Sequence, residues 1–180
     1  TMFQERILTM LKRTIIKGMQ AILTFTFLFG FAFLSTTSAS AEEIDVTNIY
    51  FMQDTANNAG THSTTGKTYT VLDNAIALKK GERLRPTDFP PIRVYEDPDG
   101  KIWTLDHRRL ITFKLAGIDT INVVRVTKEV YENEKPLKFT TNNGGEAITL
   151  LSSNGPKIIV KRNGQSKWSL ETLQQNKLKF

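Results

Sequence analysis

Short runs of hydrophobic residues, separated by polar and turn-forming residues, recur along the chain from about residue 44 onward. Runs of about five to nine residues that are rich in Ile, Val and aromatic side chains are typical of strands. The pattern therefore predicts strands at 44–52, 92–96, 101–105, 121–126, 137–141, 146–151 and 157–162.

The residues between these runs indicate how several strands are connected. Asp-Pro-Asp-Gly at 97–100 has the composition of a tight turn, so the strands at 92–96 and 101–105 are predicted to form an antiparallel hairpin. The two aspartates are better explained by this turn than by a metal site. Asn-Asn-Gly-Gly at 142–145 and Ser-Asn-Gly-Pro at 153–156 are further hairpin signals.

Three segments have the pattern of helices. In the first, Thr70 has a capping-box partner three residues later and Gly81 suits the C-terminal cap. The second covers 107–116 and ends before Gly117. A third helix is predicted from Ser169.

Two further stretches show neither pattern. Residues 55–67 are rich in Gly, Ser, Thr and Asn, which predicts a loop in which His62 is a solvated side chain rather than a ligand. Residues 85–91 contain three prolines, which predicts a connector without regular structure. Trp168 is expected to pack on the sheet.

The order of these elements mixes strands with short helices and includes antiparallel hairpins. This predicts the α+β class, with a small mixed sheet and short helices. Residues 42–135 are expected to form the main domain, and 136–165 a β-hairpin or meander packed on it. Residues 166–180 are expected to form a basic tail.

The first 41 residues have the pattern of an export signal. Met10 is the predicted start, followed by a cationic segment and the apolar run 19–34, and Ala39, Ser40 and Ala41 supply the small residues that a signal peptidase needs. An uncleaved membrane anchor is the alternative, because the run is near the lower limit for spanning a bilayer. We expect cleavage before Glu42, a secreted or periplasmic protein, and no stable membrane insertion afterward.

The amino-acid composition limits the catalytic groups, metal sites and partners that can be expected. The chain has a formal net charge of +6, but the predicted signal holds four of the basic residues, so charge is weak support for a nucleic-acid partner. The absence of cysteine excludes thiol chemistry and cysteine-based zinc sites. With only two histidines, a histidine-rich metal site is not expected, and the metal requirement stays open.

Four charged or titratable residues meet where a strand runs into a helix: Asp106, His107, Arg108 and Arg109. Asp106 is expected to cap the helix. Arginines are unfavourable in the first turn because the helix dipole is positive there, so an anion should compensate them. A helix N-terminus flanked by arginines suits a phosphate group, whereas the alternative is that Asp106 and other local acids neutralise the arginines.

The stretch from 105 to 124, LDHRRLITFKLAGIDTINVV, resembles the arginine box of the ParB/sulfiredoxin superfamily. Arg108 and Arg109 match the family's arginine pair, and Ala116 and Gly117 match the end of its helix. The resemblance covers roughly 44–127. The likeness is closer to the ParB-like domains of secreted polymorphic toxins, which carry an Asp and an Arg pair after a similar strand.

Departures from the family limit what the resemblance implies. Partition proteins have Gly-Glu where this chain has Asp106 and His107, and they continue into a helix-turn-helix that is not visible here. Sulfiredoxins have a catalytic cysteine where this chain has Asp106, so sulfinic acid repair is excluded.

The resemblance implies an exported domain that binds a phosphate-bearing ligand, a nucleotide or nucleic acid. Effector-type nuclease or nucleotide hydrolase or transferase activity, with magnesium, would be consistent with it. The residues expected to bind phosphate are Gln53, Asp106, His107, Arg108 and Arg109, and His107 and Asp54 are the candidate catalytic residues. His107 is chosen because an ordinary imidazole transfers protons near neutral pH.

Gln53 and Asp54 resemble the polar end of the family's first strand, with Asp54 as a magnesium ligand or base; an ordinary polar strand end is the alternative. A non-catalytic exported binding module is the second hypothesis, since the dense acidic cluster of two-metal nucleases is missing from the sequence. A toxin-like function would also imply a cognate inhibitor protein as a partner.

Overall fold

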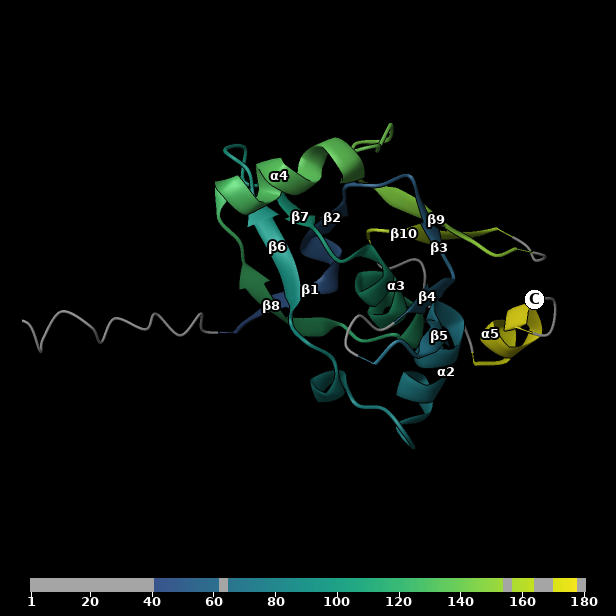
Figure 1. Cartoon of the computed structure of the whole chain (residues 1–180). Coiled ribbons are helices and arrows are strands. Elements are labelled where there is room, and N and C mark those ends of the chain that lie inside the picture. The colour runs from purple at the N-terminus through teal and green to yellow at the C-terminus, as the bar shows by residue number, and fades with distance from the viewer. Residues whose placement is uncertain (1–40, 62–64, 154–156, 164–169, 178–180) are drawn as a thin grey trace, which may run out of the picture. The chain divides into compact units, whose positions relative to one another are not determined.

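A computed structural model describes residues 41–61, 65–153, 157–163 and 170–177 (Figure 1). All of them belong to one compact unit. Of the predicted signal peptide, only Ala41 belongs to the described residues. His62, Trp168 and Ser169 also lie outside them. No helix in these described ranges is long and apolar enough to cross a membrane.

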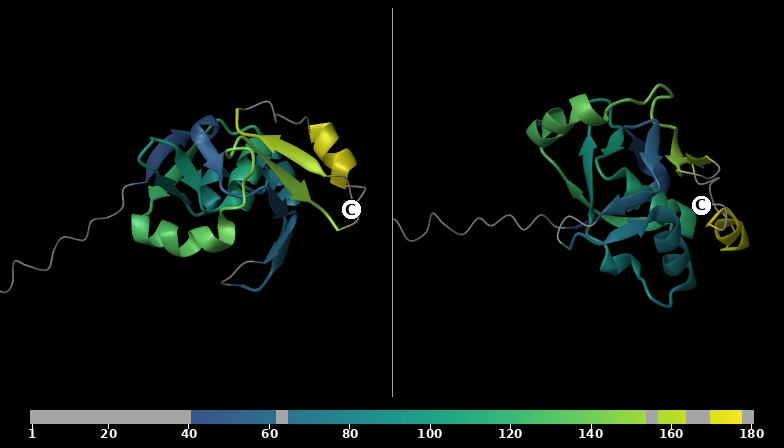
Figure 2. Two further views of the ribbon diagram at one scale, coloured as in Figure 1. Left: turned by 90° about the horizontal axis from the view of Figure 1, so that it is seen from above. Right: turned by 45° about the vertical axis from the view of Figure 1, so that its right-hand side comes forward.

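The architecture is mixed α+β, as predicted, with a curled five-stranded sheet (Figures 1 and 2). Its neighbouring pairs alternate between antiparallel and parallel along the sheet. The strands in order are β1 (Glu42–Asp45), β8 (Thr120–Arg125), β6 (Ile92–Glu96), β7 (Ile102–Thr104) and β2 (Ile49–Phe51). The antiparallel hairpin of β6 and β7 confirms the prediction from the turn at 97–100.

The prediction of one strand over 44–52 is wrong. The segment forms β1, the 3-10 turn η1 (Val46–Asn48) and β2, and these two strands are the opposite edges of the five-stranded sheet. Asp45 stabilises the turn because its side chain accepts a hydrogen bond from the Thr47 N–H at 2.7 Å. Three residues can join the two edges only if the sheet curls. The hydrophobic run at 44–52 therefore does form strands, but two short ones rather than one continuous strand.

Two smaller sheets complete the strand pairing. The first has the order β10 (Ile158–Lys161), β9 (Ala147–Leu151) and β3 (Thr55–Asn57), and the second pairs β4 (Ala59–Thr61) with β5 (Thr68–Thr70). The antiparallel pairing of β9 and β10 agrees with the hairpin signal between them. The prediction of a loop over 55–67 is wrong for residues 55–57 and 59–61, which form β3 and β4. These strands were missed because they are short and largely polar and because β3 pairs with a distant strand, β9.

The predicted helices at 70–81 and 107–116 are confirmed as α2 (Val71–Lys80) and α3 (His107–Ala116). The Thr70 hydroxyl accepts a hydrogen bond from the Asp73 N–H at 2.9 Å and so caps α2. Gly81 and Gly117 end the two helices in the left-handed conformation that glycine adopts readily. A C-terminal helix, α5 (Leu170–Lys177), follows the predicted start.

The prediction of a strand over 137–141 is wrong. Residues 128–138 instead form α4 (Lys128–Lys138), whose first turn is capped by the Thr127 hydroxyl. This helix buries only Tyr131, so it lacks the apolar stripe that identifies a helix in a sequence. The proline-rich connector also contains a short 3-10 turn, η2 (Pro86–Asp88).

Helix α3 is the central element of the core. Eight of its residues are buried, and it contacts α2 and the strands β3 and β10. Even its Lys114 is enclosed, and the ammonium donates hydrogen bonds to the carbonyls of Val46 at 2.6 Å and Arg162 at 2.7 Å. Because most of α3 is enclosed, the position of its N-terminal residues, which are those of the charged junction, is fixed.

Candidate functional site

A cavity of about 490 Å³ lies at the N-terminal end of α3. It gathers side chains from β3, β5, β6, α3 and the end of α4. Five of the six residues predicted for the site line it, and Asp54 does not. The lining residues are Gln53, Thr55, Ala56, Asn57, Tyr69, Arg93, Leu105, Asp106, His107, Arg108, Arg109 and Lys138.

The junction is held in place by hydrogen bonds from the neighbouring strands. The Leu105 N–H donates to the Arg93 carbonyl at 2.9 Å, which continues the pairing of β7 with β6 by one residue. The Asp106 N–H donates to the hydroxyl of Thr104 at 3.1 Å. The chain therefore enters α3 with a fixed direction, and the side chains of the first helical turn have defined positions.

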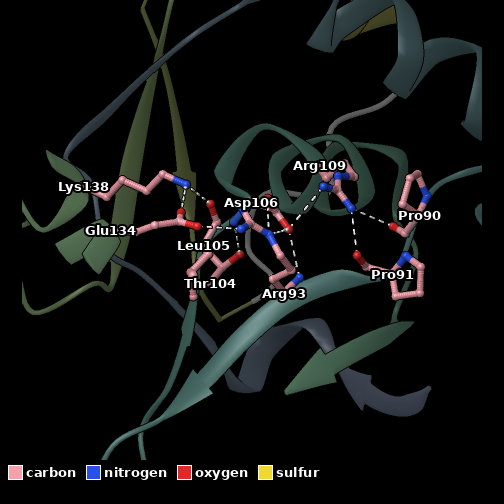
Figure 3. A network of polar contacts seen from close by, with 9 residues as sticks. All are labelled: Pro90, Pro91, Arg93, Thr104, Leu105, Asp106, Arg109, Glu134 and Lys138. Carbon is pink, nitrogen blue, oxygen red and sulfur yellow. Dashed lines mark hydrogen bonds and ion pairs between the residues drawn. The ribbon is translucent and has the colours of Figure 1, made fainter. Parts of the chain in front are cut away.

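Asp106 does not cap α3 with its side chain, contrary to the sequence-based expectation. Its carboxylate is only 10% exposed and accepts hydrogen bonds from the Arg93 backbone N–H at 2.9 Å and from Arg93 Nη2 at 2.8 Å (Figure 3). Arg109 Nη2 approaches the same carboxylate at 3.2 Å. Burial raises the pKa of Asp106, but the hydrogen bonds and charges of the two arginines outweigh burial and hold that pKa below its usual value.

Arg93 connects the junction to α4. Its Nη1 atom contacts a Glu134 oxygen at 2.6 Å, and the other Glu134 oxygen pairs with Lys138 (Figure 3). The Lys138 ammonium also donates to the Leu105 carbonyl at 2.8 Å. Sequence reasoning missed all three residues, because Arg93 is one polar position in a strand and the helix that carries the other two was not predicted.

Arg109 is a structural tether. Its Nη1 atom donates to the carbonyls of Pro90 and Pro91, both at 2.8 Å, while Nη2 pairs with Asp106 (Figure 3). Consecutive helix residues point about 100° apart, so the two arginines cannot both face the cavity in the same way. Arg109 is the one that pairs with an acid, as the alternative of local neutralisation predicted, and it ties the proline-rich connector to α3.

Replacing Arg109 with Ala should lower the free energy of unfolding by about 1.5 kcal/mol, because two carbonyls lose their side-chain donor and the Asp106 carboxylate loses one of its two arginines. Arg108→Ala is the matched control and should change stability by less than about 0.5 kcal/mol. Urea unfolding followed by circular dichroism measures both. Equal stability of the two variants would contradict the assignment of Arg109 as the tether.

Arg108 has a different environment from Arg109. It is exposed, it lines the cavity, and its Nη1 atom donates a long hydrogen bond of 3.4 Å to the Ala59 carbonyl. No carboxylate pairs with Arg108 among the ion pairs of the described residues. Its guanidinium is therefore the cation of the junction with the most capacity to bind a ligand.

His107 is buried, with 5% of its surface exposed, and its Nε2 atom accepts a hydrogen bond from the Met52 N–H at 3.0 Å. Burial, assisted by the positive charge of Lys138, lowers the pKa of His107 to about 3. This lowered pKa argues against the expectation that His107 transfers protons near neutral pH. A neutral imidazole that accepts at Nε2 carries its proton on Nδ1, where it is a hydrogen-bond donor.

Asp54 lies outside the cavity lining. Its carboxylate accepts a hydrogen bond from the Asn142 N–H at 2.9 Å, and its own N–H donates to the Thr140 hydroxyl at 3.3 Å. Asp54 thus fastens the loop before β9. Across the described ranges, no group of three His, Cys, Asp or Glu residues is arranged to hold a metal ion, so the proposed role of Asp54 as a magnesium ligand has no supporting partners.

Polar and aromatic side chains complete the cavity. Gln53 follows β2, Thr55 and Asn57 belong to β3, and Tyr69 belongs to β5. Tyr69 pairs across the hairpin with Gly60, and a Cβ atom on that glycine would lie 2.6 Å from the tyrosine ring. The absence of a side chain at position 60 therefore lets the ring lie against the hairpin backbone.

Comparisons with protein-family models, curated proteins and solved structures found no significant match to this chain. The likeness to the ParB/sulfiredoxin superfamily accordingly rests on the residues of the sequence.

Proposed function

We propose that the cavity at the start of α3 binds a phosphate-bearing ligand. The observation that carries the proposal is the charge of its lining: Arg93, Arg108, Arg109 and Lys138 contribute four cations, and Asp106 is the one carboxylate among the lining residues that the structure describes. Guanidinium and ammonium groups that converge on one cavity favour an anion with several acceptor oxygens.

The helix end adds to this preference. The Asp106 side chain makes no capping hydrogen bond, so it does not compete for the first N–H groups of α3. These groups and the helix dipole favour negative charge at the N-terminus. Arg108 provides an exposed guanidinium at the same place, and the Nδ1–H of the neutral His107 is a further donor. These donors match the oxygens of a phosphate group.

The ligand that fits the motif resemblance is a nucleotide or nucleic acid. On this proposal the domain is an exported ParB-like domain of the effector or toxin type, with a cognate inhibitor protein as its partner. Magnesium would enter with the phosphates of the ligand rather than in a carboxylate cluster, since the described residues form no such cluster.

A non-catalytic binding module is the second candidate, and the chemistry of the cavity favours it over a nuclease. General-base catalysis near neutral pH needs a group that titrates close to that pH. His107 has a pKa of about 3, and Asp106 is held by two arginines. Incubation of the purified protein with DNA, RNA and nucleoside triphosphates, with and without magnesium, separates the candidates, because product formation would exclude the non-catalytic module.

Arg108→Ala should weaken binding of the phosphate ligand about tenfold, because a charge-assisted hydrogen bond contributes roughly 1.5 kcal/mol or more. Isothermal titration calorimetry with inorganic phosphate, pyrophosphate and nucleotides measures this loss, and a thermal melt should show unchanged stability.

Arg83→Ala is the matched control for this experiment, since Arg83 is an exposed arginine that does not line the cavity. It should bind as the wild type does. If every phosphate compound binds Arg108→Ala and the wild type equally, or binds neither, the cavity is not a phosphate site and the proposed function fails.

A further inference from the structure

We infer that Glu134 is a selectivity residue for this cavity: its carboxylate occupies Arg93 and Lys138 and so disfavours ligands that bring a second anionic group to them. The inference rests on the proposed function, since it concerns the affinity of the same cavity for phosphate compounds. It assigns a role to a residue that does not itself line the cavity.

The geometry shows one carboxylate shared by two cations. One Glu134 oxygen lies 2.6 Å from Arg93 Nη1 and the other pairs with Lys138 (Figure 3). Both cations line the cavity. All three side chains are about a quarter to a third exposed, so an anion from solution can reach the cations and Glu134 can move away without leaving a buried charge.

The cations that line the cavity fall into two sets according to their carboxylate partners, and we treat these sets as two parts of the cavity. Arg108, in the first turn of α3, is free of carboxylate partners among the ion pairs of the described residues and can receive one phosphate group. Arg93 and Lys138 form the second part, where Glu134 pairs with both cations and Asp106 also pairs with Arg93. A ligand with one phosphate group leaves that ion pair intact, whereas a ligand with two adjacent phosphate groups must compete with Glu134.

A purely structural role is the alternative, because Glu134 also connects α4 to the sheet. Apart from this connection, α4 is held by Tyr131, which stacks on Tyr95 with ring centroids 4.1 Å apart, and by Lys138, which donates to the Leu105 carbonyl. In a structural role, loss of the Glu134 charge would loosen α4 and weaken every ligand. In the proposed role, the same change strengthens binding, and most strongly for the ligand with more charge.

The test compares wild type, Glu134→Gln and Glu132→Gln in calorimetric titrations with inorganic phosphate and with pyrophosphate at low ionic strength. Glutamine keeps the size and an acceptor oxygen of Glu134 while removing its charge. Glu132 is the matched control, because it lies on the same helix and pairs only loosely, at 3.8 Å, with Lys135. Removal of one partly exposed charge should tighten pyrophosphate binding by about fivefold and phosphate binding by about twofold.

A second variant tests the same ion pair from the side of the cation. Lys138→Met removes a cation of the second part of the cavity, so it should weaken pyrophosphate more than phosphate. A rise in the pyrophosphate-to-phosphate affinity ratio for Glu134→Gln together with a fall for Lys138→Met supports the inference. Suppose that the wild type binds phosphate and that both variants have the wild-type ratio of pyrophosphate to phosphate affinity. The inference then fails and the proposed function stands. If the wild type and all variants bind neither compound, both fail.

Discussion

Lowering the pH from 7 to 4 should reduce the free energy of unfolding by about 3 kcal/mol through His107 alone. The side chain is buried and its pKa is about 3 in the folded protein, whereas an unfolded chain restores the ordinary value of about 6.5. A lower pKa in the folded state means that the unfolded state binds the proton more readily. The stability that depends on a neutral His107 is therefore complete above pH 6.5 and is lost as the pH falls toward 3.

His107→Gln isolates this effect, because the glutamine side chain can accept the hydrogen bond from the Met52 N–H without titrating. Urea unfolding at half-unit intervals from pH 7 to pH 4 gives the two stability profiles. The difference between wild type and variant should shrink by about 3 kcal/mol over this range. His62→Gln, which replaces the other histidine of the sequence, is the control and should retain the wild-type profile. Parallel profiles for wild type and His107→Gln would contradict the burial of a neutral imidazole.

Local signals in the sequence correctly predicted the elements whose ends depend on neighbouring residues. The cap at Thr70, the glycines at positions 81 and 117 and the turn at 97–100 each act within four residues of their own position. Such signals are present in the sequence whatever the rest of the chain does. The boundaries of α2 and of the hairpin of β6 and β7, and the C-terminal end of α3, therefore follow from them.

The elements that sequence reasoning missed depend on distant partners. Strand β3 is ordered by parallel pairing with β9, more than ninety positions away in the register, and the short strands β4 and β5 carry no alternating hydrophobic pattern. Helix α4 buries one residue and so has no apolar stripe in its sequence. The cap at Thr127 was its clear local signal. Tertiary contacts, not intrinsic preference, decide the structure of these segments.

The same division applies to the candidate site. The junction at 106–109 was visible because its charges are consecutive and unusual for a helix start. Which arginine is exposed and which is tethered depends on where Pro90, Pro91 and Ala59 lie, and these positions follow from the fold. Likewise, Arg93 and Glu134 are 41 positions apart in the sequence, so no local pattern predicts that they pair.

Asp106→Asn should lower the free energy of unfolding by about 3 kcal/mol, because it removes the one negative charge between Arg93 and Arg109. The side chain is 10% exposed, so water compensates little of the loss. Asparagine keeps the shape of the residue, which limits any packing change. Asp99→Asn, in the exposed turn before β7, is the control and should cost less than about 0.5 kcal/mol.

The acid dependence of this variant checks the cause. The pKa of Asp106 is lower in the folded than in the unfolded state, so its contribution is complete above the ordinary aspartate pKa of about 4 and is lost as the pH falls below it. Wild type should therefore lose stability relative to Asp106→Asn below pH 4. A constant difference between the two proteins down to pH 2 would show that packing, not charge, accounts for the cost.

A double-mutant cycle with Arg93→Gln then identifies the partner that is left without its counterion. Asp106 receives a backbone hydrogen bond and several side-chain contacts from Arg93, but a single ion pair at 3.2 Å from Arg109. If the stranded charge of Arg93 causes most of the cost, Asp106→Asn should destabilise the Arg93→Gln background by only about 1 kcal/mol. An unchanged cost in that background would assign the effect to Arg109 or to the backbone N–H of residue 93, which the side-chain substitution leaves in place.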